Sequence, residues 1–196
     1  MRKLKIIEHI SLDGVIEVPA PGEEVDFPYG DWTAPYRTPA GRDLVLARYG
    51  GSFDLLLGRR TYDLWSGFWP KAPSSPMSIG INAATKYIVT HRPESLQWGP
   101  VEGLGPDIVA DVRRIKSHDG PNLILNGSST LTSILLENGL ADEIVLLIYP
   151  VLLGRGKRFF TEGTLPRSFE LESTQGLPSG IIVNAYKFVG PLKNPV

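Results

Sequence analysis

The sequence contains no cysteine among its 196 residues. Disulfide bonds, thiolate metal sites, iron–sulfur clusters and cysteine nucleophiles are therefore excluded. The 3 histidines, His9, His91 and His118, lie far apart and without a metal-ligand spacing, so no metal site is predicted. A serine in a G-x-S-x-G elbow is also missing. Because a chain without disulfides is compatible with a reducing compartment, we expect a cytoplasmic protein.

Neither an excess of charge nor a long hydrophobic run is present. The 20 basic residues are balanced by 21 acidic ones, so no overall field attracts nucleic acid or an anionic membrane. No run approaches the ~18 apolar residues of a membrane-spanning helix. The start of the chain, MRKLKIIEHISLDG, lacks the apolar segment and cleavage site of a signal peptide. These absences favour a small-molecule partner, with neither nucleic acid nor a membrane bound.

A length of 196 residues fits one domain, residues 1–196. Strand-like and helical segments alternate through its middle, and a crossing from Trp69 to Pro76 is too rich in proline to be regular. The predicted strands are Leu4–Ile10, Phe53–Leu57, Tyr87–Thr90, Leu123–Leu125 and Glu143–Tyr149, followed by a hairpin of Phe169–Thr174 and Ile181–Phe188. The predicted helices are Arg42–Tyr49, Arg60–Trp65, Ile108 to Gly120, and one around Leu131, Ile134 and Leu135 that ends at Asn138-Gly139.

This order predicts an α/β fold. A mixed, mostly parallel sheet would carry helices on both faces and a C-terminal antiparallel hairpin. In such sheets ligands bind beyond the carboxyl ends of the parallel strands. The turns that follow those strands are therefore the first places to search for a site.

The segment from Val18 to Pro39 is too long and irregular for an ordinary connection, which is typical of a lid or a binding loop. Its acidic and aromatic side chains would suit a flat, uncharged or cationic ring. The same aromatic side chains could instead pin the loop to the core. The side chains concerned are Asp26, Phe27, Tyr29, Asp31, Trp32 and Tyr36.

Three turns after predicted strands could bind phosphate. Gly58 ends one strand, and Arg59, Arg60 and Thr61 begin a helix whose free N–H groups and positive dipole end attract anions. Gly127–Thr130 combines close backbone approach with hydroxyl donors, and Thr90–Arg92 offers a hydroxyl, an imidazole and a guanidinium. Simpler roles remain open: a solvated or carboxylate-paired arginine, a serine that caps a helix, and an ordinary polar loop.

Several segments together resemble a known family. They are SLDG after the first strand, LLGRRTYDLW with its following FWP, KYIVT, and GSSTLTSILLENGLADEIVLLIYPVLLGRGKRFF. They are similar to dihydrofolate-reductase-like proteins grouped with the C-terminal reductase domain of riboflavin biosynthesis, over about Leu4 to Tyr186. The resemblance implies a three-layer dihydrofolate-reductase-like fold, NADPH as cofactor, and hydride transfer to a C=N or C=C bond of a small heterocycle. Pterin, dihydrofolate and aminouracil rings belong to that class.

The resemblance also implies roles for individual residues. Residues 59–61 would meet the cofactor phosphates, residues 90–92 the adenosine 2′-phosphate, and residues 127–130 the pyrophosphate. Ile16 and the backbone of His9 would flank the nicotinamide. The expected cofactor contacts are His9, Ile16, Gly58, Arg59, Arg60, Thr61, Thr90, His91, Arg92, Gly127, Ser128, Ser129, Thr130 and Leu131.

The proton source for such a reduction is open. Asp43 lies near the place of the acid in dihydrofolate reductase, but the intervening residues match poorly, and an aspartate at such a position is more often a helix-surface carboxylate. Asp13 could touch the substrate, or it could cap its own turn. Relatives with similar domains, together with the apolar segment from Glu143 to Leu153, lead us to expect a homodimer.

Two departures from the riboflavin-pathway pattern narrow the inference. Ile7 stands where those reductases carry a lysine, and Asn126-Gly127-Ser128 replaces Glu-Gly-Gly. Their deaminase partner domain is also absent from this sequence. Reduction of 5-amino-6-(5-phosphoribosylamino)uracil is therefore not favoured. The rival hypothesis is a catalytically silent nucleotide-binding or regulatory module on the same fold.

Overall fold

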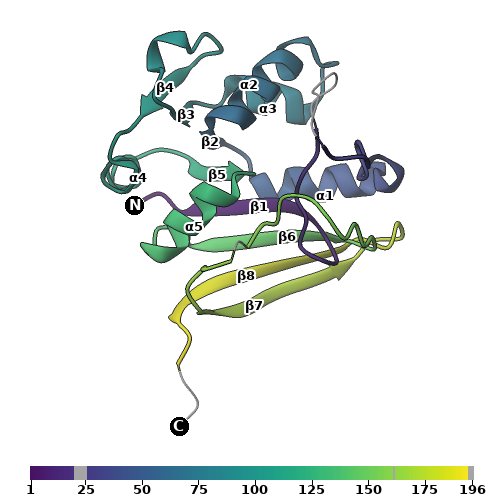
Figure 1. The fold of residues 1–196 in the computed structure, drawn as a ribbon. Helices are drawn as coiled ribbons and strands as arrows, with labels where there is room; N and C mark the ends of the chain where they lie inside the picture. Colours follow the sequence, from purple (N-terminus) through teal and green to yellow (C-terminus); the bar gives the residue numbers. More distant parts are fainter. Residues whose placement is uncertain (20–25, 161, 194–196) are drawn as a thin grey trace.

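The computed structural model describes residues 1–19, 26–160 and 162–193. Its centre is an eight-stranded sheet with the order β4-β3-β2-β5-β1-β6-β8-β7 (Figure 1). The strands from β4 to β6 in this order run parallel, and β8 and β7 complete the sheet as an antiparallel pair. The strands are β1 (Leu4–Ser11), β2 (Phe53–Gly58), β3 (Lys86–Val89), β4 (Val101–Leu104), β5 (Asn122–Asn126), β6 (Glu143–Tyr149), β7 (Arg167–Gly176) and β8 (Ile182–Pro191).

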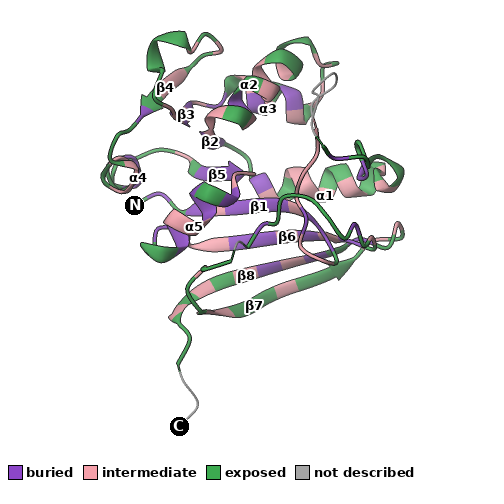
Figure 2. Ribbon diagram, in the orientation of Figure 1, coloured by how far each residue is buried: buried purple, intermediate pink, exposed green. Residues whose placement is uncertain are grey.

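Helices cover both faces of this sheet. One face carries α1 (Pro39–Tyr49), α2 (Arg59–Phe68) and α3 (Pro76–Ala83), and the other carries α4 (Ile108–Ser117) and α5 (Ser129–Glu137). The inner strands are apolar along most of their length because both of their faces are buried. Figure 2 shows the buried residues concentrated on β1, β5 and β6, whereas β7 is largely exposed. The α/β class, the helices on both faces and the C-terminal hairpin are as predicted. Among the described residues, every helix is too short or too polar to cross a bilayer.

Two elements were missed by the sequence patterns. Helix α3 begins at Pro76, the last residue of the crossing predicted to be irregular, after a short 3₁₀ turn at Trp69–Lys71. Ser75 caps it, because its hydroxyl accepts the N–H of Ser78 while the Ser78 hydroxyl accepts that of Ser75. Strand β4 has four residues and only one fully buried side chain, so it lacks the alternation that signals a strand.

The loop from Val18 to Pro39 is held to the core by its aromatic side chains. Phe27 is 6% exposed and Trp32 is 7% exposed, and both pack in the core cluster on the α1 face. The Trp32 indole N–H also donates to the Glu17 carbonyl at 2.8 Å. For these two residues the pinning alternative is therefore confirmed, while Tyr29 remains 44% exposed. Residues 20–25 of the proposed lid lie outside the described residues.

Candidate functional site

The three expected phosphate turns follow three neighbouring strands. Strand β2 lies between β3 and β5, and all three run parallel. Their carboxyl ends, at Gly58, Val89 and Asn126, therefore lie at the same edge of the sheet. The turns at residues 58–61, 90–92 and 127–131 leave the sheet side by side at this edge. The topology thus brings together residues that are far apart in the sequence.

The turns after β2 and β5 approach each other closely. A methyl group added at Gly58 would lie 3.2 Å from Ser128 Oγ and 3.3 Å from Ser128 Cβ. One added at Gly127 would lie 3.4 Å from Thr61 Oγ1, and Gly127 has a φ of 68° that disfavours a side chain. Glycine at both positions therefore allows the two turns to pack closely against each other.

Each of these two turns ends at a helix N-terminus. Helix α2 begins at Arg59 and α5 begins at Ser129, so their first N–H groups lack partners within the helix and carry the positive end of a dipole. Ser128 has a left-handed backbone with φ 67° and ψ 81°, and its hydroxyl accepts the N–H of Leu131 at 3.3 Å. The serine is therefore an N-cap, as the simpler alternative proposed, and it also lies against Gly58. The free N–H groups and the positive dipole ends of the two helices suit an anion.

Arg59 joins the turn after β2 to the loop after β3. Its Nε donates to both carboxylate oxygens of Asp63, at 2.8 and 2.9 Å. Its Nη1 donates to Ser95 Oγ at 2.6 Å, to the Arg92 carbonyl at 3.3 Å and to Thr90 Oγ1 at 3.4 Å. One of the two arginines was expected to pair with a carboxylate, and the Arg59–Asp63 ion pair confirms this. Through these hydrogen bonds Arg59 holds the loop after β3 against the start of α2.

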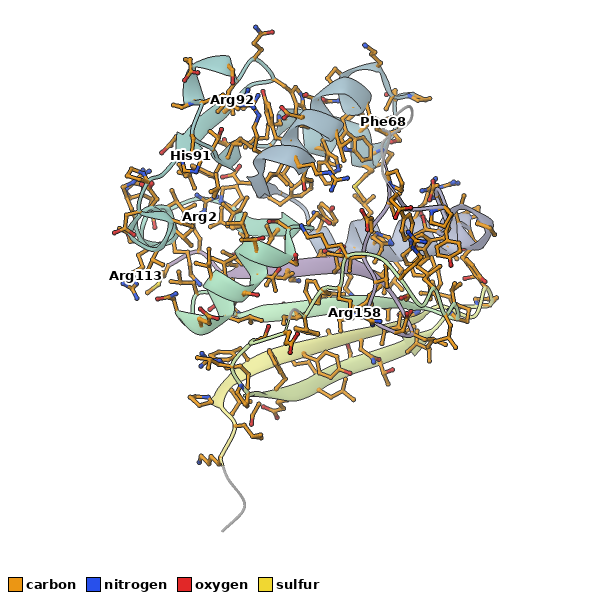
Figure 3. The ribbon with its side chains drawn as sticks, in the orientation of Figure 1. Arg2, Phe68, His91, Arg92, Arg113 and Arg158 are labelled. Atoms are coloured by element: carbon orange, nitrogen blue, oxygen red, sulfur yellow. The ribbon has the colours of Figure 1, made fainter. Side chains whose placement is uncertain are left out.

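A cavity of about 200 Å³ opens beside that loop. His91 and Arg92 are exposed at its edge, and Figure 3 shows both side chains extending from the segment between β3 and β4. Arg60, on the second position of α2, is also exposed. The cavity is lined by Arg59, Thr90, His91, Arg92, Gly105 and Pro106, among others. Val89, Leu104 and Ile108 make much of the wall apolar, and Arg59, Thr90, His91 and Arg92 bring cationic and hydroxyl groups to it.

At the other end of the same edge, His9 meets Tyr149. Strands β1 and β6 are parallel neighbours, and His9 Nδ1 lies 2.7 Å from the Tyr149 hydroxyl. Burial, followed by the nearby Arg37, lowers the pKa of His9 to about 4, so its imidazole is neutral at pH 7. Burial raises the pKa of Tyr149 to about 12. Trp32 and Tyr36 pack edge-on against the Tyr149 ring, with centroids 5.3 and 5.7 Å away.

Two polar residues of this edge were missed by sequence reasoning. Tyr149 ends β6, and no local pattern in the sequence places it beside β1. Glu8 interrupts the apolar run of β1 and is only 7% exposed. Burial raises its pKa to about 8, against smaller opposing effects of the His9 and Gly127 backbones and of Lys157. A glutamate inside an otherwise apolar strand was a signal that could have been followed.

The two aspartates proposed as proton donors are placed differently. Asp13 accepts the Ser11 hydroxyl at 2.6 Å and the Gly154 N–H at 2.8 Å, and these interactions lower its pKa to about 2. It is therefore ionised at neutral pH and fastens the turn after β1 to the segment after β6. Asp43 is exposed on α1. A role for either in proton transfer stays a prediction, and the geometry favours a structural role for Asp13.

Ile16 lies near the His9 end of the site. Its side chain packs against the core cluster on the α4–α5 face, and its N–H donates to the Lys157 carbonyl at 2.9 Å. Leu131 and Ser129 are buried under the first turn of α5, and Thr130 is exposed on it. The expected contacts thus lie on or after β1, β2, β3 and β5, toward the carboxyl ends of these parallel strands.

Comparisons with known proteins show the family of this chain. A family model described as the RibD C-terminal domain matches residues 2–183. The uncharacterized protein YyaP of Bacillus subtilis strain 168 is 26% identical over 140 residues, which cover 69% of this chain and 74% of YyaP.

Two solved structures share the fold. A pyrimidine reductase-like protein of Corynebacterium diphtheriae has a TM-score of 0.63 at 15% identity, with 96% of this chain and 92% of that chain covered. Dihydrofolate reductase of Enterococcus faecalis, complexed with NADP(H), has a TM-score of 0.61 at 15% identity, with 95% and 96% covered. The likeness in structure shows a dihydrofolate-reductase-like fold, and the match to the family model over most of its length shows that the chain belongs to the RibD C-terminal domain family.

Proposed function

We propose that this chain is a reductase that uses NADPH to reduce a C=N or C=C bond of a small heterocyclic substrate. The observation that carries the proposal is the gathering of the turns at 58–61, 90–92 and 127–131 along one sheet edge. A dinucleotide with several phosphate groups needs donors spread over such a length. Two adjacent helix N-termini and the cationic cavity beside them supply these donors.

The residues present fit the cofactor. Glycine at positions 58 and 127 leaves the backbone of both turns without a covering side chain, which suits the close approach of a pyrophosphate to the backbone. The cavity at Thr90, His91 and Arg92 would take the adenosine 2′-phosphate. The backbone of His9 and the side chain of Ile16 would flank the nicotinamide. When bound, the cofactor supplies the hydride, and the protein orients it and excludes water.

The reaction also needs one proton for the substrate, and we propose that His9, paired with the buried Tyr149, delivers it. Both groups are neutral at pH 7. If the Tyr149 hydroxyl donates to His9 Nδ1, the imidazole carries its hydrogen on Nε2 and can donate it to a substrate nitrogen. A neutral imidazole is used in this way in triosephosphate isomerase. Asp43, exposed on α1, remains the alternative donor, and Tyr149→Phe and Asp43→Asn should distinguish the two possibilities.

The surroundings of Tyr149 favour a flat, uncharged ring as substrate. The partly buried Tyr36 and the neutral His9 lie beside Tyr149, whereas Trp32 packs in the core cluster. Pterin, dihydrofolate and aminouracil compounds fit that description. Reduction of 5-amino-6-(5-phosphoribosylamino)uracil is a narrower possibility, which the apolar Ile7, fully buried in β1, does not favour.

The test has two stages. Purified protein is titrated with NADPH and NADH while its tryptophan fluorescence is followed, and we expect saturable binding with NADPH preferred. NADPH oxidation is then measured with pterin, dihydrofolate and aminouracil substrates, of which at least one should be reduced. Absence of binding would contradict the proposal. Tight NADPH binding with no turnover would instead favour the rival hypothesis of a nucleotide-binding or regulatory module.

We also propose that the protein is a homodimer in the cytoplasm. The apolar segment Glu143–Leu153 no longer supports the dimer. The apolar strand β6 lies between β1 and β8, so burial within one chain accounts for its composition. Leu152, just after β6, is 74% exposed, and β7 offers an uncovered sheet edge. Light scattering of the purified protein measures the mass directly, and a monomer mass would contradict the dimer.

A further inference from the structure

Glu8 places a carboxyl group beside the turn expected to hold the pyrophosphate. Ile7 pairs with Asn126 in the parallel register of β1 and β5, so Glu8 lies next to Gly127. Its Oε1 accepts the N–H of His9 at 3.2 Å, and the backbone N–H of Gly127 faces the same carboxyl group. Among the described residues, its Oε2 is fully buried and has no hydrogen-bond partner. A carboxylate in such a position loses its hydration without replacement.

Few charges compensate this burial. Lys157 is the cation that acts on Glu8, and its effect is smaller than that of burial. Leu146 of β6 lies opposite Glu8, and β5 consists of uncharged residues throughout. On α5 the first charged residue is Glu137, at the far end of the helix. His9 is neutral at pH 7, and burial, with a smaller contribution from Glu8, raises the pKa of the Tyr49 hydroxyl above its usual range.

We infer that Glu8 is a positioning residue of the cofactor site, and that it must carry a proton for the dinucleotide pyrophosphate to bind at the Gly127–Ser128 turn. This inference rests on the proposed function. An ionised Glu8 would place a negative charge beside the bound phosphates, in a region of low dielectric where repulsion is strong. It would also compete for the Gly127 N–H. A protonated Glu8 removes both effects.

The consequence is a linkage between cofactor binding and proton uptake. Because the pKa of Glu8 is about 8, roughly nine-tenths of the protein is protonated at this residue at pH 7 and roughly one-tenth at pH 9. If only the protonated form binds, the affinity for NADPH falls about tenfold between these two pH values. NADH carries the same pyrophosphate and should lose the same factor. Adenosine 2′-monophosphate lacks the pyrophosphate, so its binding should not change.

The experiment measures dissociation constants of these three nucleotides from pH 6 to pH 9, for the wild-type protein, for Glu8→Gln and for Glu143→Gln. Glutamine is a neutral isostere, so Glu8→Gln should keep the affinity seen at pH 7 and vary less than about twofold up to pH 9. Glu143 pairs with Lys5 at the opposite, amino edge of the sheet, so its variant should follow the wild type. Calorimetry of the wild type at pH 8 should show uptake of about half a proton per NADPH bound.

The outcomes separate this inference from the proposed function. NADPH binding that varies less than twofold from pH 7 to pH 9, or a tenfold loss that persists in Glu8→Gln, would overturn the role of Glu8 and leave the reductase proposal intact. Failure to bind NADPH at any pH would overturn the reductase proposal itself. If Glu8→Gln does not fold, the wild-type proton uptake and the contrast between NADPH and adenosine 2′-monophosphate still decide the matter.

Discussion

Replacing Arg92 with alanine should weaken the binding of NADPH and leave that of NADH almost unchanged. The guanidinium of Arg92 is exposed at the edge of the cavity and donates to no other described residue. Its backbone is fixed separately, because its carbonyl accepts Ser95 Oγ at 2.7 Å and Arg59 Nη1 at 3.3 Å. The substitution should therefore remove a phosphate contact without disturbing the loop.

The size of the effect follows from the kind of contact. A hydrogen bond to a charged group contributes about 1.5–3 kcal/mol. Because the side chain is exposed and salt screens its charge, we expect the lower end of this range at an ionic strength of about 0.1 M. A loss of about 1.5 kcal/mol corresponds to an increase of roughly tenfold in the dissociation constant of NADPH. Higher salt should reduce the difference.

The assay is a fluorescence titration of each variant with NADPH and with NADH. Arg113→Ala is the matched control, since Arg113 is exposed on α4, away from the His91–Arg92 loop (Figure 3). Arg59→Ala should weaken both cofactors, because it releases the contacts to Ser95, Thr90 and the Arg92 backbone. Equal losses of NADPH and NADH affinity in Arg92→Ala would refute the assignment of the 2′-phosphate to this loop.

Further predictions concern the two turns and the buried imidazole. Gly58→Ala should weaken both cofactors at least tenfold, because the new methyl group lies 3.2 Å from Ser128 Oγ and crowds the turn proposed to hold the pyrophosphate; unchanged titrations would contradict this. Ser128→Ala should lower the free energy of unfolding by about 0.5–2 kcal/mol through loss of the N-cap, as measured with denaturant, and Ser128→Gly should lose less because glycine tolerates the φ of 67°. The pKa of His9 is lowered from 6.5 to about 4, so the folded protein favours the neutral imidazole. Its contribution to the free energy of unfolding is complete above pH 6.5. Up to about 3 kcal/mol of it is lost as the pH falls toward 4. The stability difference between wild type and His9→Asn should shrink over that range, and a constant difference would contradict it.

Local patterns in the sequence determined much of the fold. The strand predicted at Glu143–Tyr149 is observed with the same bounds, because an apolar run of strand length between turn residues has few alternatives. The alternation of strands and helices was enough to predict a parallel sheet covered on both faces. Helix α3 was not predicted because it follows a proline-rich segment and its main signal is a capping box at Ser75. Strand β4 was not predicted because it is short and has only one buried side chain.

Local patterns predicted the candidate site only in part. Glycine, hydroxyl and arginine residues after strands marked the three turns, because phosphate binding depends on local backbone geometry and helix ends. Whether the turns share one edge depends on strand order, which no local pattern contains. Only the tertiary structure places β2 between β3 and β5 and thereby brings Gly58 against Ser128.

The sequence determines which titratable residues are present, and the tertiary structure determines their protonation states. The sequence alone determined that no disulfide forms and that Glu8, His9 and Tyr149 are present. Their protonation depends on burial and on neighbours from other strands, since desolvation and contact distances set a pKa. Parallel pairing of β1 with β6 puts His9 within 2.7 Å of Tyr149, and pairing with β5 buries Glu8 beside Gly127. These contacts join residues more than a hundred positions apart, so the folded chain alone could decide them.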